Sequence, residues 1–219
     1  MPNSIIIVGA GPNLGAAVAR RFGREGLSVG LVARDKQKLA AIESDLEKHE
    51  IDSAYATADI RDAEALSGAI ESLAQGLGPV EVLEYSPLPA REFMKPILET
   101  SVDDVRGPLE FSVLGAVAAV TTVVQPMLER GSGTILFTTG GAAINPYPLR
   151  AGVGISFAAE VAYARMLHDE LADRGIHVGH TAIAGRIAPG ADHEPDEIAD
   201  VLWNHHADRS AFQVRLGID

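Results

Sequence analysis

The chain contains no cysteine, and this absence removes several kinds of chemistry. Disulfides, thiolate metal ligands and cysteine nucleophiles are all excluded. Positive charge is also scarce, because 18 Lys and Arg stand against 30 Asp and Glu, for a formal net charge of −12. This negative balance argues against nucleic acid or an anionic membrane surface as a partner.

Long hydrophobic runs and targeting signals are missing as well. We find no apolar stretch that approaches the roughly 18 residues of a membrane span. Residues 1–4 have no basic region, so we expect no signal peptide and a cytoplasmic protein. The 219 residues are 47% hydrophobic and 22% charged, which is typical of a soluble globular chain. The length favours a single domain over residues 1–219.

Short runs rich in Ile and Val alternate with segments of helical spacing along the whole chain. Such unalternating runs are typical of strands buried on both faces. The pattern predicts strands at residues 4–8, 27–33, 54–58, 80–85, 134–139, 176–183 and 211–216. It predicts helices at residues 14–25, 36–48, 62–76, 101–130, 155–174 and 195–205. This alternation predicts an α/β fold, a doubly wound sheet of seven parallel strands with right-handed crossovers.

A glycine-rich turn lies between the first expected strand and the first expected helix. It reads Gly9-Ala10-Gly11-Pro12-Asn13-Leu14-Gly15. Gly9 allows a tight turn, Gly15 lets the helix pack close to the sheet, and the helix N-terminus offers free N–H groups to a pyrophosphate. The turn therefore predicts a dinucleotide site, with a plain strand-to-helix connection as the alternative.

These residues resemble the short-chain dehydrogenase/reductase family, whose turn reads Gly-x-x-x-Gly-x-Gly. Gly9, Asn13 and Gly15 fall on the three glycine positions. Asn13 departs from the pattern, but asparagine tolerates positive φ better than other side chains, so we expect the turn to survive. The resemblance implies a Rossmann fold that binds a nicotinamide dinucleotide through this turn, including Gly11 and Leu14.

The resemblance extends over nearly the whole chain. Asp59-Ile60 is similar to the Asp-Val that follows the third strand of the family, where the Asp side chain meets the adenine. Ser86 lies where the family has its Asn-Asn-Ala-Gly segment, and Gly185 and Ile187 match its Pro-Gly-x-Val segment. The resemblance implies that these positions line the cofactor site.

The residue after the second strand bears on the choice of cofactor. Enzymes selective for NAD usually place an acid at this strand end to bind the ribose 2′-hydroxyl. Here Ala33 takes that place and Arg34 follows. A guanidinium matches a 2′-phosphate in a bidentate manner, so Arg34 predicts NADP as the cofactor. The alternative is an exposed loop arginine.

The catalytic pattern of the family is absent. Its Asn, Ser, Tyr and Lys positions hold Ser112, Gly140, Val153 and Phe157. The lid segment that follows Gly185 in the family is also short here, which predicts a wet cleft and weaker electrostatic stabilisation.

Three side chains are candidates for the missing catalytic groups. Tyr147 and Arg150 follow the fifth expected strand, where the loop borders the nicotinamide in the family, and Thr139 directly precedes the Ser position. We interpret Tyr147 as a proton donor with Arg150 near enough to stabilise its phenolate. Tyr85 could also reach the cleft. For each of the loop side chains, an ordinary structural role is the alternative.

The seven histidines do not predict a metal site. His177 and His180 are three apart in an expected strand and therefore point to opposite faces. His205 and His206 end a helix that we expect at the surface, in solvent.

Two functions remain open at this point. The first is an NADP(H)-dependent oxidoreductase that acts on a small-molecule carbonyl, imine or activated alkene with a non-standard proton donor. The second is a catalytically inactive NADP(H)-binding sensor or scaffold. In either case we expect a homodimer or homotetramer, because the expected helices at residues 106–130 and 155–174 carry many small residues and the resemblance implies that these helices pair across a two-fold axis. The alternative is that the small residues pack on the chain's own sheet.

Overall fold

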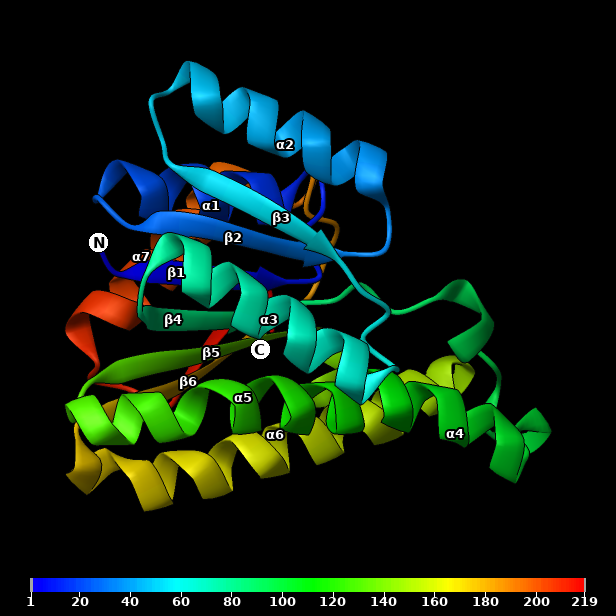
Figure 1. Ribbon diagram of the computed structural model, residues 1–219. Helices are drawn as coiled ribbons and strands as arrows, with labels where there is room; N and C mark the ends of the chain where they lie inside the picture. Colours follow the sequence, from blue (N-terminus) through cyan, green and yellow to red (C-terminus); the bar gives the residue numbers. More distant parts are fainter. Residues whose placement is uncertain (1, 219) are drawn as a thin grey trace.

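The computed structural model describes residues 2–218, and Met1 and Asp219 lie outside the described residues. Its centre is a sheet of seven strands in the order β3-β2-β1-β4-β5-β6-β7, all parallel (Figure 1). The strands are β1 (Ser4–Val8), β2 (Ser28–Ala33), β3 (Ser53–Thr57), β4 (Val80–Tyr85), β5 (Gly133–Gly140), β6 (Ile176–Ile183) and β7 (Gln213–Leu216). The expected α/β fold is therefore confirmed.

Helices cover both faces of the sheet (Figure 1). One face is covered by α1 (Leu14–Arg24), α2 (Lys36–Lys48) and α7 (Pro195–Asp208). The other is covered by α3 (Ala63–Leu77), α5 (Gly115–Arg130) and α6 (Ala151–Leu171), while α4 (Val102–Leu109) packs against α6 beyond the sheet. Successive residues of β1 feed the two layers in turn, with Ile5 and Ile7 in one core and Ile6 and Val8 in the other. This two-sided burial is why the strand is apolar throughout.

The long helix expected at residues 101–130 is interrupted. Between α4 and α5 the backbone forms a π-helical segment, Glu110–Leu114, directly after Pro108. A proline inside a helix removes one N–H donor and disturbs the preceding turn, and such breaks often appear as π-bulges. A capping box begins α4, because Ser101 and Asp104 each accept a hydrogen bond from the backbone N–H of the other.

Helix α6 begins at Ala151, four residues before the expected start at residue 155. Gly152 and Gly154 make this first turn resemble a loop in the sequence. In the fold, Gly152 packs so closely on α4 that a Cβ atom there would lie 2.8 Å from Pro108 Cγ. A close helix contact, rather than a loop, explains that glycine.

The expectation about long apolar stretches was wrong for one segment. The continuous helical run Val102–Arg130 is long and apolar enough to cross a membrane, with a mean hydropathy of 1.7 in its most apolar window. Half of that window is buried inside the fold, because the helix covers the sheet. A core helix passes the same test of length and composition as a membrane span, so this segment is weak evidence for a membrane.

The strand order places the functional region. The connection that leaves β1 leads to β2 on one side of β1, and the connection that leaves β4 leads to β5 on the other side. The two connections therefore diverge at the carboxyl ends of β1 and β4. In open α/β sheets such a switch point leaves a crevice outside the strand ends. The glycine-rich turn and the ends of β4, β5 and β6 all meet there.

Candidate functional site

The glycine-rich turn is held tightly against the end of β4. Gly9 has a φ of +93°, and a Cβ atom there would lie 2.5 Å from Pro87 Cα. Gly15 lies in the first turn of α1, where a Cβ atom would lie 2.8 Å from Ala10 Cα. Both glycines are therefore required by the packing of the turn itself.

Gly11 has a different reason to be a glycine. A Cβ atom at Gly11 would meet no heavy atom closer than the Gly9 carbonyl oxygen at 4.0 Å. The space beside it belongs to the cleft, and within the described chain no side chain caps the N-terminus of α1. The first N–H groups of a helix lack intrahelical acceptors, and they attract anions. An open backbone beside an uncapped helix end fits a pyrophosphate.

Asn13 does not adopt the conformation that we expected. Its φ is −95°, so the turn needs no positive φ at this position. The side chain instead donates from Nδ2 to the carbonyl oxygen of Ile187, at 3.3 Å. Asn13 thereby joins the glycine-rich turn to the loop after β6, a contact between residues far apart in the sequence.

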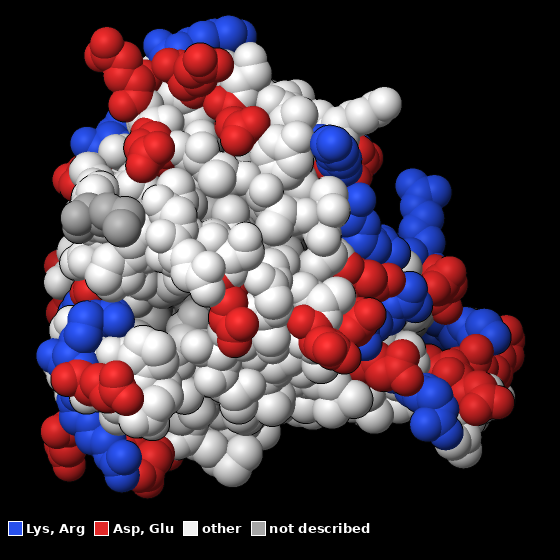
Figure 2. Space-filling view, viewed as in Figure 1, with Lys and Arg blue, Asp and Glu red and all other residues white. Residues whose placement is uncertain are grey.

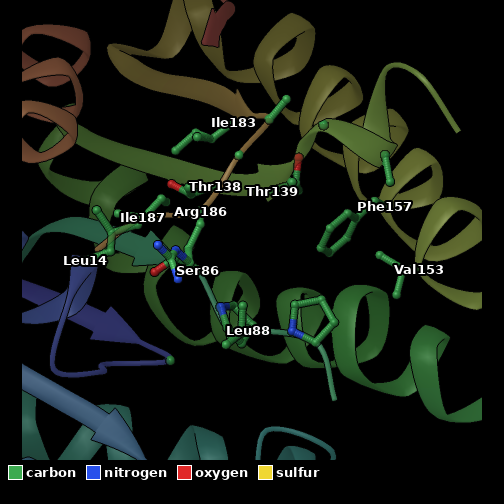
Figure 3. Close-up of a pocket in the computed structure, with 18 of the residues that line it drawn as sticks. Leu14, Ser86, Leu88, Thr138, Thr139, Val153, Phe157, Ile183, Arg186 and Ile187 are labelled. Atoms are coloured by element: carbon green, nitrogen blue, oxygen red, sulfur yellow. The ribbon is translucent and has the colours of Figure 1, made fainter. Parts of the chain in front are cut away.

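The structure brings most of the expected site residues into one cleft of about 860 Å³. Figure 3 shows Leu14, Ser86 and Ile187 on one side of the cleft and Val153 and Phe157 on the other. The expected residues that line it are Gly9, Gly11, Asn13, Leu14, Gly15, Ser86, Thr139, Tyr147, Arg150, Gly185 and Ile187. Among the described lining residues, Arg150 and Arg186 carry charge and neither Asp nor Glu occurs. The lining is therefore suited to an anionic ligand, although the surface as a whole is acidic, with the two charge types interspersed in Figure 2.

Arg34, Asp59 and Ile60 lie outside this cleft. Arg34 is exposed after β2, and its charge is one cause of the lowered pKa of Asp59. The larger cause is Arg61, whose guanidinium lies 3.0 Å from Asp59 Oδ2. Ile60 is buried in the core. The neighbouring acid Asp35 is the N-cap of α2, because its side chain accepts hydrogen bonds from two backbone N–H groups of that helix.

A buried carboxyl group that sequence reasoning missed lies beneath the cleft. Glu84 on β4 is fully buried, and its two oxygens accept hydrogen bonds from Thr138 at 3.0 Å and from Ser86 at 2.7 Å. Both donors line the cleft. Burial is the main cause that raises the pKa of Glu84 to about 7. The strand VEVLEY carries two acids, Glu81 and Glu84, and an acid at the buried position of an otherwise apolar strand is the signal that could have found Glu84.

The positions of the missing catalytic residues form an apolar corner. Val153 and Phe157 line the cleft, and a Cβ atom on Gly140 would lie 3.4 Å from the Phe157 ring. Ser112 is buried in the π-helical segment, and its Oγ has no hydrogen-bond partner in the described chain. Tyr85, expected as a possible cleft residue, is fully buried and donates to the carbonyl of Phe111. It therefore does not reach the cleft.

The catalytic candidates lie at two depths. Tyr147 is 55% exposed at the rim of the cleft, and Arg150 lies in the same turn, with its N–H donating to the Tyr147 carbonyl at 2.9 Å. Thr139 is 4% exposed in the floor, where its Oγ1 lies 2.8 Å from Nε2 of His180. Figure 3 places Thr139 on the same side of the cleft as Phe157, next to Thr138.

The expectation that His205 and His206 are solvated was wrong. His205 is buried, and its Nε2 donates to the carbonyl of Ala211 at 2.8 Å. His206 is partly buried and lies 2.9 Å from the hydroxyl of Thr134. Helix α7 packs on α1, β5 and β6, and this packing covers the His205 and His206 side chains in its last turn. Within residues 2–218 no cluster of three or more metal-ligating side chains occurs.

The comparisons with known proteins agree with this geometry. The profile of the short chain dehydrogenase family matches residues 3–191. The chain belongs to that family. A 2,3-dihydro-2,3-dihydroxybenzoate dehydrogenase of Bacillus subtilis (strain 168) is 28% identical over 214 residues, covering 96% of this chain and 76% of the relative.

Solved structures of short-chain enzymes share the fold. A variant of actinorhodin polyketide ketoreductase with NADPH has a TM-score of 0.89 at 20% identity, covering 99% of this chain and 96% of that one. A metagenomic short-chain oxidoreductase in complex with NADP has a TM-score of 0.85 at 22% identity, covering 100% and 99%. The chain is thus a short-chain dehydrogenase in fold, with its catalytic corner replaced.

The buried carboxyl group gives a prediction about stability. Glu84 has a raised pKa in the folded state, so between about pH 4.5 and pH 7 the folded chain holds a proton that the unfolded chain has lost. The free energy of unfolding should therefore fall as pH rises through this window. We expect Glu84→Gln to remove this loss, and the variant should gain about 3 kcal/mol on wild type between pH 4.5 and pH 8 in urea unfolding.

The matched control is Glu71→Gln on the exposed face of α3. It should follow the wild-type stability at both pH values. A constant difference between Glu84→Gln and wild type across the window would show that Glu84 does not retain its proton on folding.

Proposed function

We propose that this short-chain dehydrogenase is an NADP(H)-dependent oxidoreductase that reduces a small carbonyl compound, imine or activated alkene. The observation that carries the proposal is the cleft itself, which keeps the dinucleotide-binding turn intact and opens beside it onto an apolar corner. Two structures with the same fold carry NADPH or NADP. When bound, the cofactor would supply a hydride, and the side chains around it would bind, orient and protonate.

Each part of the cofactor has a suitable partner. The uncapped N-terminus of α1 and the open backbone at Gly11 suit the pyrophosphate. When Glu84 is ionised, Ser86 and Thr138 direct their hydrogens to it, so their oxygen lone pairs are free to accept from ribose hydroxyls or an amide. Asp59 would meet the adenine, as in the family.

Arg34 gives a prediction about cofactor choice. It is exposed at the end of β2, where a 2′-phosphate would lie, and no ion pair of its side chain occurs among the described residues. We expect NADPH to bind more tightly than NADH. Arg34→Ala should weaken NADPH binding roughly tenfold or more and leave NADH binding unchanged.

Calorimetric titration of both cofactors tests this prediction. The matched control is Arg91→Ala, an exposed arginine in a different loop. Equal dissociation constants for the two cofactors in the wild type would refute the assignment of Arg34.

The proton source is the second part of the proposal. Val153 and Phe157 can neither donate a proton nor carry charge, so the family's Tyr and Lys have no equivalent at their own positions. Tyr147 is the phenol that lines the cleft, its exposure allows reprotonation from solvent, and Arg150 lies in the same turn. Thr139 would bind the acceptor's oxygen from the floor.

Tyr147→Phe keeps the ring and removes only the acidic hydroxyl. We expect turnover to fall at least tenfold with NADPH affinity unchanged, because general acids contribute roughly 10²–10⁴-fold to rates. Turnover is measured by NADPH oxidation with a panel of ketones, imines and enones. Tyr55→Phe on β3, away from the cleft, is the control.

Two outcomes would contradict this scheme in different ways. Full activity of Tyr147→Phe would mean that another group or water donates the proton. Tight NADPH binding by a wild type that turns over no acceptor would favour an inactive NADP(H)-binding sensor or scaffold, a function that the replaced catalytic corner also fits.

Assembly is the third part of the proposal. The small residues Gly115, Ala116, Ala118 and Ala119 of α5 are buried on the chain's own sheet, so they need no partner. Helix α6 differs. It exposes a stripe of apolar and small residues, namely Ile155, Ala158, Ala162 and Met166. The lower middle of Figure 2, over α5 and α6, is mostly uncharged. We propose that α6 pairs with α6 of a second copy in a homodimer or homotetramer.

Ala162→Arg places a charged side chain in the centre of that stripe. We expect light scattering at micromolar concentration to report a dimer or tetramer for wild type and a smaller species for this variant. Ala65→Arg, at an exposed alanine of α3, should leave the assembly intact. A monomeric wild type would contradict the proposal.

A further inference from the structure

A row of hydrogen-bonded side chains runs from the surface of β7 to the floor of the cleft. Arg215 Nε lies 2.8 Å from Gln213 Oε1. Gln213 Nε2 lies 3.0 Å from His180 Nδ1, and His180 Nε2 lies 2.8 Å from Thr139 Oγ1. The row crosses from β7 through β6 to β5, and Gln213 is the register partner of His180.

Arg215, at the exposed end of this row, determines which atom donates in each of the following hydrogen bonds. A guanidinium only donates, so the atom of Gln213 that faces Arg215 must be the amide oxygen. The amide nitrogen therefore faces His180 and donates to Nδ1. A neutral imidazole that accepts at Nδ1 carries its hydrogen on Nε2, and this hydrogen is donated to Thr139 Oγ1.

The surroundings of His180 keep the ring neutral. The side chain is fully buried, and burial is the main cause that lowers its pKa to about 4. The charges of His205 and Arg215 act in the same direction. The ring therefore has one hydrogen near neutral pH, and the contact with Gln213 decides which nitrogen carries it.

The consequence concerns the hydroxyl hydrogen of Thr139. Because Oγ1 accepts from His180, its own hydrogen is not used in that contact, and no other acceptor for it occurs among the described residues. Thr139 lines the cleft on the side of Phe157 and Val153 (Figure 3). The adjacent Thr138 differs from Thr139, because its hydroxyl hydrogen is already donated to Glu84. Both threonines line the cleft, but as successive residues of β5 they point to opposite faces of the sheet, Thr138 toward Glu84 and Thr139 toward His180.

We propose that His180, held by Gln213, is a positioning residue that leaves the Thr139 hydroxyl free to donate to the oxygen or nitrogen of an acceptor bound in the cleft. This inference rests on the proposed oxidoreductase function. It assigns to Thr139 the stabilisation of developing negative charge on that atom during hydride transfer, in the absence of the family's serine. The proton itself still comes from another group, because a neutral imidazole does not give up its last hydrogen to a threonine.

The first test needs no turnover. Nitrogen-15 NMR of the histidine rings in the full-length protein between pH 6 and pH 8 identifies which ring nitrogen of His180 is protonated, with His180→Met used to assign the signal. We expect the Nε2–H form throughout this range. We also expect Gln213→Met to shift the signals toward a mixture of the two tautomers. An Nδ1–H form in the wild type would overturn the proposal.

The second test measures turnover and NADPH affinity in matched variants. Thr139→Val removes the hydroxyl at constant shape, and we expect turnover to fall roughly tenfold or more with NADPH affinity unchanged, while Thr139→Ser retains most activity. His180→Met should lose a similar factor, and His180→Gln, which keeps an N–H donor, should lose less. The double variant Thr139→Val/His180→Met should lose no more than either single variant, because both remove one interaction.

The control is His177→Met, since His177 lies on the opposite face of the same strand, and it should turn over like wild type with a comparable melting temperature. Additive losses in the double variant, or full activity of Thr139→Val, would overturn the proposal. A wild type without any turnover would contradict the oxidoreductase function and with it the assigned role of Thr139, while the NMR result would still report whether Gln213 sets the tautomer.

Discussion

The constraint on which this structure depends is that a parallel sheet must be covered on both faces while all its strands end at one edge. The strands β1, β2, β4, β5 and β6 feed two apolar layers, and each return to the start of the next parallel strand requires a crossover connection, usually a helix. The carboxyl ends of β1, β4, β5 and β6 therefore collect at one place. The cleft exists there because connections diverge between β1 and β4, and not because any one side chain creates it.

Polar groups inside this sheet stand out against the apolar strands around them. Glu84, Thr138, Thr139 and His180 are all buried, and each has hydrogen-bond partners. Burying such groups costs free energy even when they are paired, and an apolar strand would be more stable. Glu84 and Thr138 lie on one face of the sheet and Thr139 and His180 on the other, and the two threonines line the cleft. A fold that retains them at that edge gains a floor with fixed donors and acceptors, which is how a site is preorganised for a polar ligand.

The two sides of the cleft differ in chemical character. The side near α1 is built from backbone N–H groups, glycines and Asn13, which joins the turn to Ile187. The side near α6 is apolar, because Val153 and Phe157 replace the family's acid and its lysine. A cofactor that carries its own reactive group needs mainly the first side. In the proposed reaction the second side would decide which acceptors fit, and the hydroxyl groups of Tyr147 at the rim and Thr139 in the floor would assist them.

The sequence by itself determined the layers, the strand positions and the turn. Runs such as Ser4–Val8 are buried on both faces only in a covered parallel sheet, and the spacing of glycines around Pro12 indicates a strand, a tight turn and a helix in one short segment. These features are local, so they can be read from neighbouring residues. The residues of the cleft followed from the family resemblance, and the structure brings Ser86, Tyr147 and Ile187 together as that resemblance implied.

What only the tertiary structure decided is the set of contacts between distant segments. The bond of Asn13 to Ile187, the contact of His206 in α7 with Thr134 in β5, and the row from Arg215 to Thr139 each join elements that the sequence keeps far apart. The direction of a hydrogen bond, such as the one that sets the His180 tautomer, depends on partners from several strands at once. Local spacing contains no information about those partners, because strand order and register bring them together only in the folded sheet.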